Sequence, residues 1–392
     1  MLEETDRLFA CEFCRVRSYL LPQLFFRYML PHGAPPGKDL FYYPYWRFKG
    51  MTFACGEGGI THRFVDASLQ GIDSPHFPLS LGLRSQAMRL SFVPPETPGR
   101  FLKPTVTFKA IGEIFDERFQ AEGKGHVFHR AQIGETISLI YAPFYTNAGR
   151  IFDAVLNRPL AETGDNPSPT MLPGGKPAWR TRFVPNLCPG CGWDLQGQSD
   201  SLILTCGNCD SVWKPTAEKL VRLHFGHLPK DGHDICFLPF WRIRADVQGY
   251  PLATYTDMVR LANLPKVPQP SWNEIPFRFW APAFKLRPQT LIHLSRSLTL
   301  TQPQDEPTPS LPSGRLFPVT LPVKEAVESL MLCLASFVKP PKNMLPRLSD
   351  AKLTPKRFLL VYVPFVEGHH EYIQPEMKIS INKNQLALSG NL

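Results

Sequence analysis

Two closely spaced pairs of cysteines constrain the fold of this 392-residue chain more than any other feature. They form the segments Cys188-Pro-Gly-Cys191 and Cys206-Gly-Asn-Cys209, with fourteen residues between the pairs. A gap of two residues lets both thiols of a pair turn inward, and Gly192 and Gly207 stand where such tight turns favour positive φ. Four thiolates at this spacing predict a tetrahedral metal site, usually of zinc. Because four protein ligands fill the coordination shell, such a site stabilises structure and leaves no position for a substrate.

The segment from Cys188 to Trp213 resembles the zinc-ribbon class, down to the Cys-Pro-x-Cys-Gly form of its first cysteine turn. The resemblance implies two β-knuckles that hold one Zn²⁺ through Cys188, Cys191, Cys206 and Cys209. Rubredoxin-like iron accepts the same ligand set, but the short interval between the two pairs favours zinc. The resemblance covers this segment only, and no family is indicated for the whole chain.

A third cysteine pair, Cys11-Glu-Phe-Cys14, begins an incomplete site. Two thiolates do not close a tetrahedral shell, but Cys55 and His62 come next in the chain and would complete a Cys₃His site. Two alternatives stay open, namely reduced thiols without a metal and a site completed by a partner. A redox role is disfavoured because no βαβ pattern surrounds the pair.

Comparison of the chain with itself predicts an internal duplication. The segment Leu40–Phe48 (LFYYPYWRF) resembles Ile235–Ile243 (ICFLPFWRI), at an offset of 195 residues that also carries Cys11 and Cys14 onto Cys206 and Cys209. Further matches follow in the same order, at offsets that grow to 221: Leu83–Gln86 with Leu286–Gln289, Gly99–Arg100 with Gly314–Arg315, and Tyr141–Phe144 with Tyr362–Phe365.

These patterns predict a strand-rich α+β fold built from two duplicated units. Each unit would contain a Pro-aromatic strand leading into a hairpin, then an amphipathic helix (108–119 or 323–334) and a last strand. The 41 prolines and 28 phenylalanines fit many short elements joined by rigid turns. The predicted divisions are a first unit over 1–161, a linker over 162–187, the zinc ribbon over 188–213 and a second unit over 214–392.

Trp46-Arg47 and Trp241-Arg242 occupy equivalent places in the two units. One interpretation is functional: such a pair stacks a nucleic-acid base or binds an anion. The second is structural: the Trp fills the core while the Arg points outward. Strand alternation favours the second interpretation. Arg84 and Arg287, in the next matching segments, pose the same question.

Charge and cysteine usage restrict partner and compartment. The formal charge of +9 permits a nucleic-acid partner, but the basic residues are dispersed, which favours a generally solvated basic surface. Glu3, Glu4 and Asp6 stand where a signal peptide would be basic, and the nine cysteines fit a reducing compartment, so cytoplasm is expected. The apolar stretches are too short for a transmembrane segment. The segment Arg15–Leu30, with a helix start near Pro22, offers a membrane-surface or partner contact, although packing within its own unit is favoured.

Motifs of catalysis are missing, including phosphate-binding glycine loops, nucleophile elbows and His-Glu-x-x-His. The sequence therefore favours a non-enzymatic, zinc-stabilised scaffold or adaptor that mediates protein assembly, while leaving enzymatic activity open. A nucleic-acid-binding protein is the first alternative. A metalloenzyme with an open second site at Cys11, Cys14, Cys55 and His62 is the second.

Overall fold

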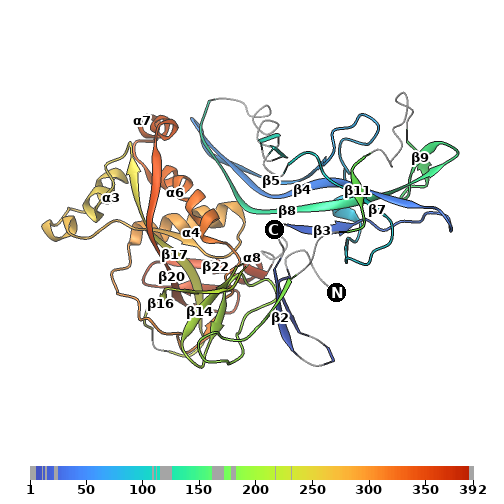
Figure 1. Ribbon diagram of the computed structural model, residues 1–392. Coiled ribbons are helices and arrows are strands. Elements are labelled where there is room, and N and C mark those ends of the chain that lie inside the picture. Colours follow the sequence, from blue (N-terminus) through green and yellow to red (C-terminus); the bar gives the residue numbers. More distant parts are fainter. Residues whose placement is uncertain are drawn as a thin grey trace.

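The computed structural model describes residues 6–10, 12–13, 16–21, 25–107, 110–111, 113–114, 126–160, 172–177, 182–216, 218–230 and 232–387. Within these residues the chain is strand-rich, and two large sheets curl into half-barrels, with most helices beside the second (Figure 1). The predicted α+β class is confirmed. In this part of the chain, no helix combines the length and the apolar character needed to cross a membrane.

The first large sheet is built around β4 (Leu40–Gly56), which pairs with β8 (Val127–Asn147) on one edge and with β5 (Gly59–Gln70) on the other. Tyr43 and Tyr45 enter one buried cluster, while Trp46 and Phe48 enter another on the opposite face. Burial on both faces explains the nearly continuous apolar run of β4. The remaining elements of this half are β3 (Phe26–Met29), β6 (Ser91–Phe92), β7 (Arg100–Leu102), β9 (Arg150–Asp153), β10 (Arg158–Pro159), β11 (Gly174–Gly175) and α1 (Arg84–Ala87).

The second large sheet is built around β17 (Ile235–Gln248) and its antiparallel neighbour β20 (Lys352–Glu367). Its other strands are β16 (Phe225–His227), β18 (Phe279–Pro282), β19 (Arg315–Leu316), β21 (Glu371–Gln374) and β22 (Ile379–Asn382). The helices of this half are α3 (Tyr255–Leu261), η1 (Pro270–Asn273), α4 (Pro288–Thr301), α5 (Val323–Glu328), α6 (Leu330–Phe337), α7 (Pro341–Met344), η2 (Leu345–Ser349) and α8 (Lys383–Ala387). The helix expected over 323–334 is present as α5 and α6, which meet at Ser329. Most of the helix expected over 108–119 lies outside the described residues.

Strand pairing follows the same register in the two large sheets. Pro44 lies opposite Tyr141, and Pro239 lies opposite Tyr362. The parallel strands also correspond, because Phe41 pairs with Arg100 of β7 as Cys236 pairs with Arg315 of β19. These pairs reproduce the sequence offsets of 195, 215 and 221 without a shift.

Equivalent hydrogen bonds accompany this register. Trp46 donates its Nε1–H to the carbonyl oxygen of Val106 at 3.0 Å, and Trp241 donates to that of Leu321 at the same distance. Both Trp side chains are buried, as the sequence predicted. The other half of that prediction, that the Arg side chains point outward, is wrong. Arg47 is buried and paired with Asp66, and the Arg242 side chain is 12 % exposed.

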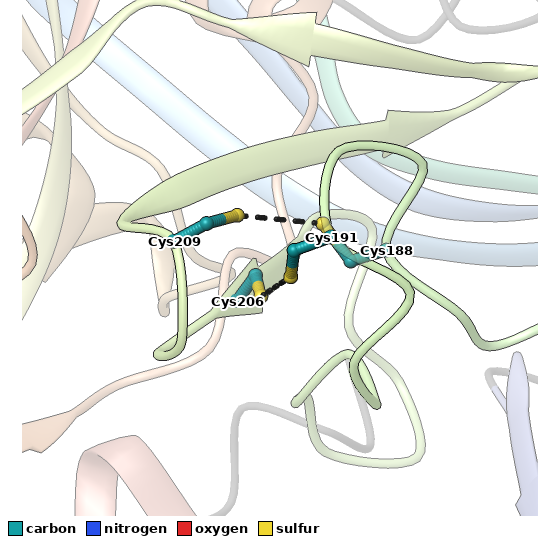
Figure 2. A group of neighbouring side chains, drawn as sticks. All are labelled: Cys188, Cys191, Cys206 and Cys209. Carbon is teal, nitrogen blue, oxygen red and sulfur yellow. Dashed lines mark hydrogen bonds between the residues drawn. The ribbon is translucent and has the colours of Figure 1, made fainter.

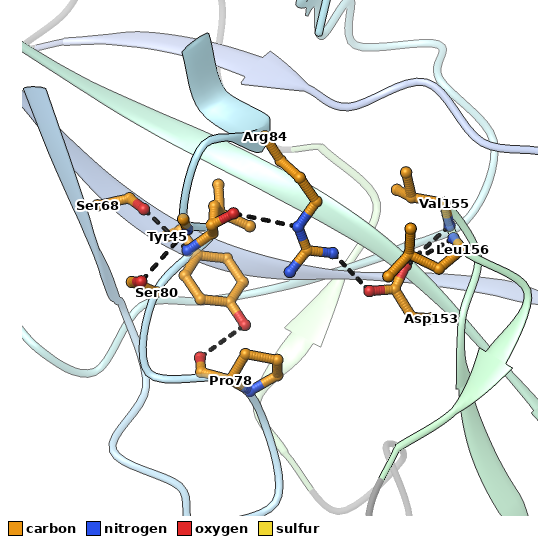
Figure 3. A network of polar contacts seen from close by, with 10 residues as sticks. Tyr45, Ser68, Pro78, Ser80, Arg84, Asp153, Val155 and Leu156 are labelled. Carbon is orange, nitrogen blue, oxygen red and sulfur yellow. Dashed lines mark hydrogen bonds and ion pairs between the residues drawn. The ribbon is translucent and has the colours of Figure 1, made fainter. Parts of the chain in front are cut away.

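Arg84 is structural in the first half. Its Nη1 lies 2.5 Å from Oδ2 of Asp153, whose Oδ1 accepts the backbone N–H groups of Val155 and Leu156 at 2.9 and 3.2 Å (Figure 3). In the second half Gln374 takes the acceptor role of Asp153, and Oε1 of Gln374 accepts two backbone N–H groups at 2.9 and 3.2 Å. Arg287, the counterpart of Arg84, is exposed.

The described residues also form two small sheets. One has the order β1 (Leu8–Ala10), β2 (Arg17–Leu21), β12 (Arg182–Pro185), and the other has the order β13 (Leu204–Cys206), β14 (Ser211–Pro215), β15 (Leu220–Leu223). Phe9 lies opposite Ser18 as Leu204 lies opposite Trp213, again at the offset of 195. Tyr19 and Leu21 join Leu204 and Trp213 in one core. Pro22 lies outside the described residues, but a helix that starts there is excluded because Phe26–Met29 form the strand β3.

The two halves share a hydrophobic core. Met51, Phe53 and Ile133, near the tips of β4 and β8, belong to the same buried cluster as the core of the second half. In Figure 1 these long strands run toward helices α6 and α7. The Gly134 N–H donates to the carboxylate of Glu325 on α5, which ties the same tip to the second half.

Candidate metal centre

Two tight turns bring the predicted cysteine ligands together. In the first turn, the Gly192 N–H donates to the Cys188 carbonyl oxygen at 2.8 Å, and the Cys188 N–H donates to the Trp193 carbonyl oxygen at 2.8 Å. Gly192 has the expected positive φ of 75°. The second turn joins β13 to β14, and Asp210 rather than Gly207 adopts positive φ, at 45°. The first of these two glycine expectations is therefore confirmed and the second is wrong.

The four sulfur atoms form one cluster (Figure 2). The Sγ atoms of Cys188 and Cys209 lie 3.6 Å apart, those of Cys191 and Cys206 lie 3.5 Å apart, and all four lie within 4.8 Å of one another. A disulfide would need about 2.05 Å, so these are free thiols. Metal–sulfur bonds of about 2.3 Å place the corners of a tetrahedron about 3.8 Å apart. The cluster therefore has the dimensions and donors of a four-thiolate metal site.

The thiol pKa values show the charge problem that a cation would solve. Burial opposes ionisation of Cys188, but the backbone N–H groups of Gly190 and Cys191 and the Ser211 hydroxyl outweigh it and lower its pKa. The Asn208 side chain lowers the pKa of Cys191. Burial raises the pKa of Cys206, and at Cys209 burial and the neighbouring thiols outweigh the Ser211 hydroxyl, so its pKa also rises. Because neighbouring thiolates repel, full ionisation needs a positive charge at the centre.

Ser211 links the sulfur cluster to the small core around Trp213. Its Oγ lies 3.0 Å from Sγ of Cys209 and accepts the Nε1–H of Trp213 at 2.8 Å. Such contacts around metal ligands orient them and raise affinity. Ser211 was not predicted as part of the site. Its place two residues after Cys209, opposite Cys206 in the hairpin, is the signal that could have identified it.

The second predicted site stays a prediction. Cys11 and Cys14 lie outside the described residues. Cys55 is buried on β4, opposite His129 on β8, and burial raises its pKa to about 12. His62 lies on β5, opposite Phe53, and is exposed. Among the described residues, Cys188, Cys191, Cys206 and Cys209 are the group of potential ligands close enough to share an ion.

A groove of about 620 Å³ lies beside the first cysteine turn. Two of its lining side chains are large, apolar and exposed: Trp193 is 60 % exposed and Leu187 is 50 % exposed. Asn186 lines the groove but is itself buried, and its Oδ1 has no hydrogen-bond donor although its Nδ2 donates to the Leu195 carbonyl oxygen at 2.5 Å. An acceptor buried without a donor is costly, so the wall of the groove contains one unsatisfied polar atom.

Comparisons of the chain with protein-family models, with curated proteins and with solved structures found no match. The case for function therefore depends on the chain's own geometry.

Proposed function

We propose that this chain is a non-enzymatic, zinc-stabilised adaptor of the cytoplasm, in which a zinc ribbon presents a groove that binds an extended segment of a partner protein. The groove beside Trp193 carries the proposal, because it joins exposed apolar side chains to an unsatisfied buried acceptor. Large exposed aromatic side chains are the usual anchors of protein interfaces. The four-thiolate shell would hold the groove in shape without taking part in a reaction.

Zinc is the ion we propose for the cluster. Four thiolates satisfy the borderline-soft, tetrahedral preference of Zn²⁺. The sulfur spacing of 3.5 and 3.6 Å supports that geometry, and the short interval between the pairs favours zinc over iron. The free state of the described cysteines supports a reducing compartment.

We also propose that the two halves are copies of one ancestral unit, with the ribbon at the start of the second copy. The identical pairing of Pro44 with Tyr141 and of Pro239 with Tyr362 supports this origin, as do the paired Trp hydrogen bonds. Independent origins would not be expected to preserve register, parallel neighbours and side-chain hydrogen bonds together.

An extended peptide is the partner chemistry that the groove favours. Strand β12 (Arg182–Pro185) is the outer strand of its small sheet and leads directly into Asn186 and Leu187. An incoming strand can therefore pair with β12 and cover Trp193 with an apolar side chain.

The test compares Trp193→Ala with a control, Val267→Ala, which removes another exposed apolar side chain in the second half. Proteins captured with the wild-type chain are identified by cross-linking from position 187, and the cross-linked segment is synthesised as a peptide. We expect the peptide, titrated by calorimetry, to bind V267A as tightly as the wild type and to bind W193A at least about tenfold more weakly. Equal binding to W193A, or cross-links to nucleic acid alone, contradicts the adaptor proposal.

Measurement of the zinc content distinguishes the adaptor from the metalloenzyme alternative. One zinc per chain supports a purely structural site, whereas two would favour the metalloenzyme with a second site at Cys11, Cys14, Cys55 and His62.

Ser211→Ala tests the contribution of the Ser211 hydroxyl to zinc binding at the four-cysteine site. We expect S211A to lower zinc affinity about tenfold, measured by competition with a chromogenic chelator, because it removes the hydroxyl that orients Cys209. Unchanged affinity would contradict the role given to Ser211.

A further inference from the structure

Arg47 and Arg242 occupy equivalent positions in the two large sheets but have different charged neighbours. In the first sheet, Nε and Nη2 of Arg47 donate to Oδ1 and Oδ2 of Asp66 at 2.7 and 2.6 Å. Asp66 lies on β5 opposite Lys49, so two basic side chains have a carboxylate between them. This arrangement is a bidentate ion pair, the strongest geometry for an arginine.

In the second sheet the carboxylate position holds a third base. Arg242 and Arg244 stand at the places of Arg47 and Lys49. Trp280 lies opposite Arg242, and Ser68 lies opposite Arg47. Arg278 precedes Trp280 by two residues, as Asp66 precedes Ser68, so Arg278 takes the place of Asp66. The exchange of Asp for Arg reverses the charge at the centre of the group.

A fourth arginine, Arg357 on β20, lies directly opposite Arg244. Directly opposed residues and residues two apart on a strand share a face of the sheet. Arg242, Arg244, Arg278 and Arg357 therefore form one group, which we call the arginine cluster. The first sheet has Thr136 opposite Lys49 and thus has no base at the place of Arg357.

The positive charge of Arg242 has only a weak acidic partner. The Arg242 side chain is 12 % exposed, and its buried Nη1 has no hydrogen-bond acceptor. The carboxylate of Glu306 lies 4.0 Å from Nη2, and the Glu306 side chain is 79 % exposed. Burial lowers the pKa of Arg242 and the charge of Arg278 lowers it further, while Glu306 opposes both effects. A buried guanidinium with a free donor is a costly arrangement that an anion relieves.

The chain fixes the position of Glu306 through its loop. The His227 N–H donates to the Thr308 carbonyl oxygen at 3.0 Å, and the Thr308 N–H donates to the His227 carbonyl oxygen at 2.9 Å. The ring of His227 adds a contact of 2.8 Å from Nδ1 to the Ser310 carbonyl oxygen. The loop thus holds one exposed carboxylate near the cluster, at a distance too long for a hydrogen bond.

We propose that the arginine cluster binds one oxyanion of the phosphate class, with Arg242 and Arg278 as its principal ligands and Glu306 as a weak internal competitor. The planar guanidinium groups match the oxygens of a phosphate in bidentate geometry, which is why arginine predominates in such sites. The ligand is the free ion or the phosphate of a small monoester. The site goes beyond the adaptor role and does not depend on it.

The test uses the purified full chain in phosphate-free buffer, with inorganic phosphate and phenyl phosphate as calorimetric probes. Arg278→Asp is the decisive variant, because it rebuilds in the second sheet the Arg47–Asp66 pair of the first. We expect R278D to fold normally and to bind both probes at least about tenfold more weakly. Glu306→Gln removes the competing charge, so we expect it to bind about threefold more tightly. Arg89→Gln removes an exposed arginine of the first half and serves as the control with unchanged binding.

The two probes identify the source of the phosphate. Tighter binding of phenyl phosphate supports a monoester, and tighter binding of inorganic phosphate supports the free ion. The proposal is overturned if neither probe binds up to roughly 10 mM, or if R278D binds as well as the wild type. Binding of a single-stranded oligonucleotide with a steep salt dependence, without binding of the small probes, also overturns it and indicates a nucleic-acid surface.

Discussion

At the scale of single residues, three buried cysteines lie apart from the four that cluster at the candidate metal centre. Cys55 and Cys236 lie within strands of the two large sheets, and Cys333 lies in α6. Burial raises their pKa values to about 12, 11 and 12. Cysteine therefore serves as a small packing residue at these three positions, whereas the four clustered cysteines have the spacing of metal ligands.

This contrast predicts a pattern of thiol labelling. At pH 8 a thiol of pKa 11 is about 0.1 % thiolate, against roughly a quarter for an unperturbed thiol. We expect N-ethylmaleimide to spare Cys55, Cys236 and Cys333 in the native protein and to modify them in guanidinium, as read by peptide mass spectrometry. Cys191, which is exposed, should become reactive once a chelator removes the metal. Native labelling of Cys333 at the unfolded rate would contradict the burial argument.

The raised thiol pKa values also give a direction for stability. The folded state holds these protons more tightly than the unfolded chain, whose thiols titrate near about 8.5. Their contribution is therefore complete below that pH and declines as the pH rises toward the folded values.

Single-residue roles were predictable where they depend on local spacing. The candidate metal site follows from two short motifs, so the sequence located the four cysteines that cluster. The partner of Arg47 is Asp66, nineteen residues further on in a neighbouring strand, and strand alternation alone placed Arg47 in solvent. Asn186 escaped notice because its unsatisfied oxygen is a property of the folded surroundings.

At the scale of elements, a glycine lets a parallel strand approach each central strand. A Cβ added at Gly99 would lie 2.7 Å from a ring carbon of Tyr42 and 3.1 Å from the Leu40 carbonyl oxygen. At Gly314 the corresponding distances are 3.0 Å to Phe237 and 3.1 Å to the Ile235 carbonyl oxygen. The same close approach therefore recurs at equivalent positions in both sheets.

This recurrence predicts that alanine lowers the free energy of unfolding by different amounts at Gly99, Gly314 and Gly58. Gly99→Ala combines the clash with a φ of +112°, so we expect a loss of about 2–4 kcal/mol. Gly314→Ala has the clash without positive φ, and we expect about 1–3 kcal/mol. Gly58→Ala is the control, because nothing lies within 4 Å of its Cβ, and its effect should stay within about 0.5 kcal/mol. Urea unfolding measures all three, and G314A exceeding G99A in cost would contradict the argument.

Elements were predictable where pattern and packing agree. The Pro-aromatic strands β4 and β17 were found, because a residue run buried on both faces is apolar throughout. The segment 15–30 is equally apolar, but β2 and β3 within it are strands that pair with β12 and β8, and the sequence does not identify those distant partners. The interruption between α5 and α6 at Ser329 was also missed. The Ser329 hydroxyl donates to the Ala326 carbonyl oxygen at 2.7 Å, a local contact that competes with helical pairing.

At the scale of the whole molecule, the halves depend on each other. Sequence matching aligned positions within the halves but carried no information about contacts between them. Those contacts include the shared core around Phe53 and Ile133, and the acceptance of the Gly134 N–H by Glu325. Lys285 lies at the same junction, where burial lowers its pKa, Glu325 raises it, and Lys49 and Arg7 lower it.

Removal of Glu325 should therefore weaken the junction in a pH-dependent way. Glu325→Ala removes the carboxylate that acts most strongly on the charge of the buried Lys285 and leaves the weaker effect of Asp200, so we expect a loss of about 3 kcal/mol or more at pH 7. A lysine whose folded pKa is depressed destabilises the fold at low pH, and this penalty disappears as the pH rises above its unfolded value near 10.4. The deficit of E325A should thus shrink between pH 8 and 10, as measured by urea unfolding against Glu274→Ala, an exposed control. A deficit that stays constant over this range would show that Glu325 acts only through Gly134 and packing.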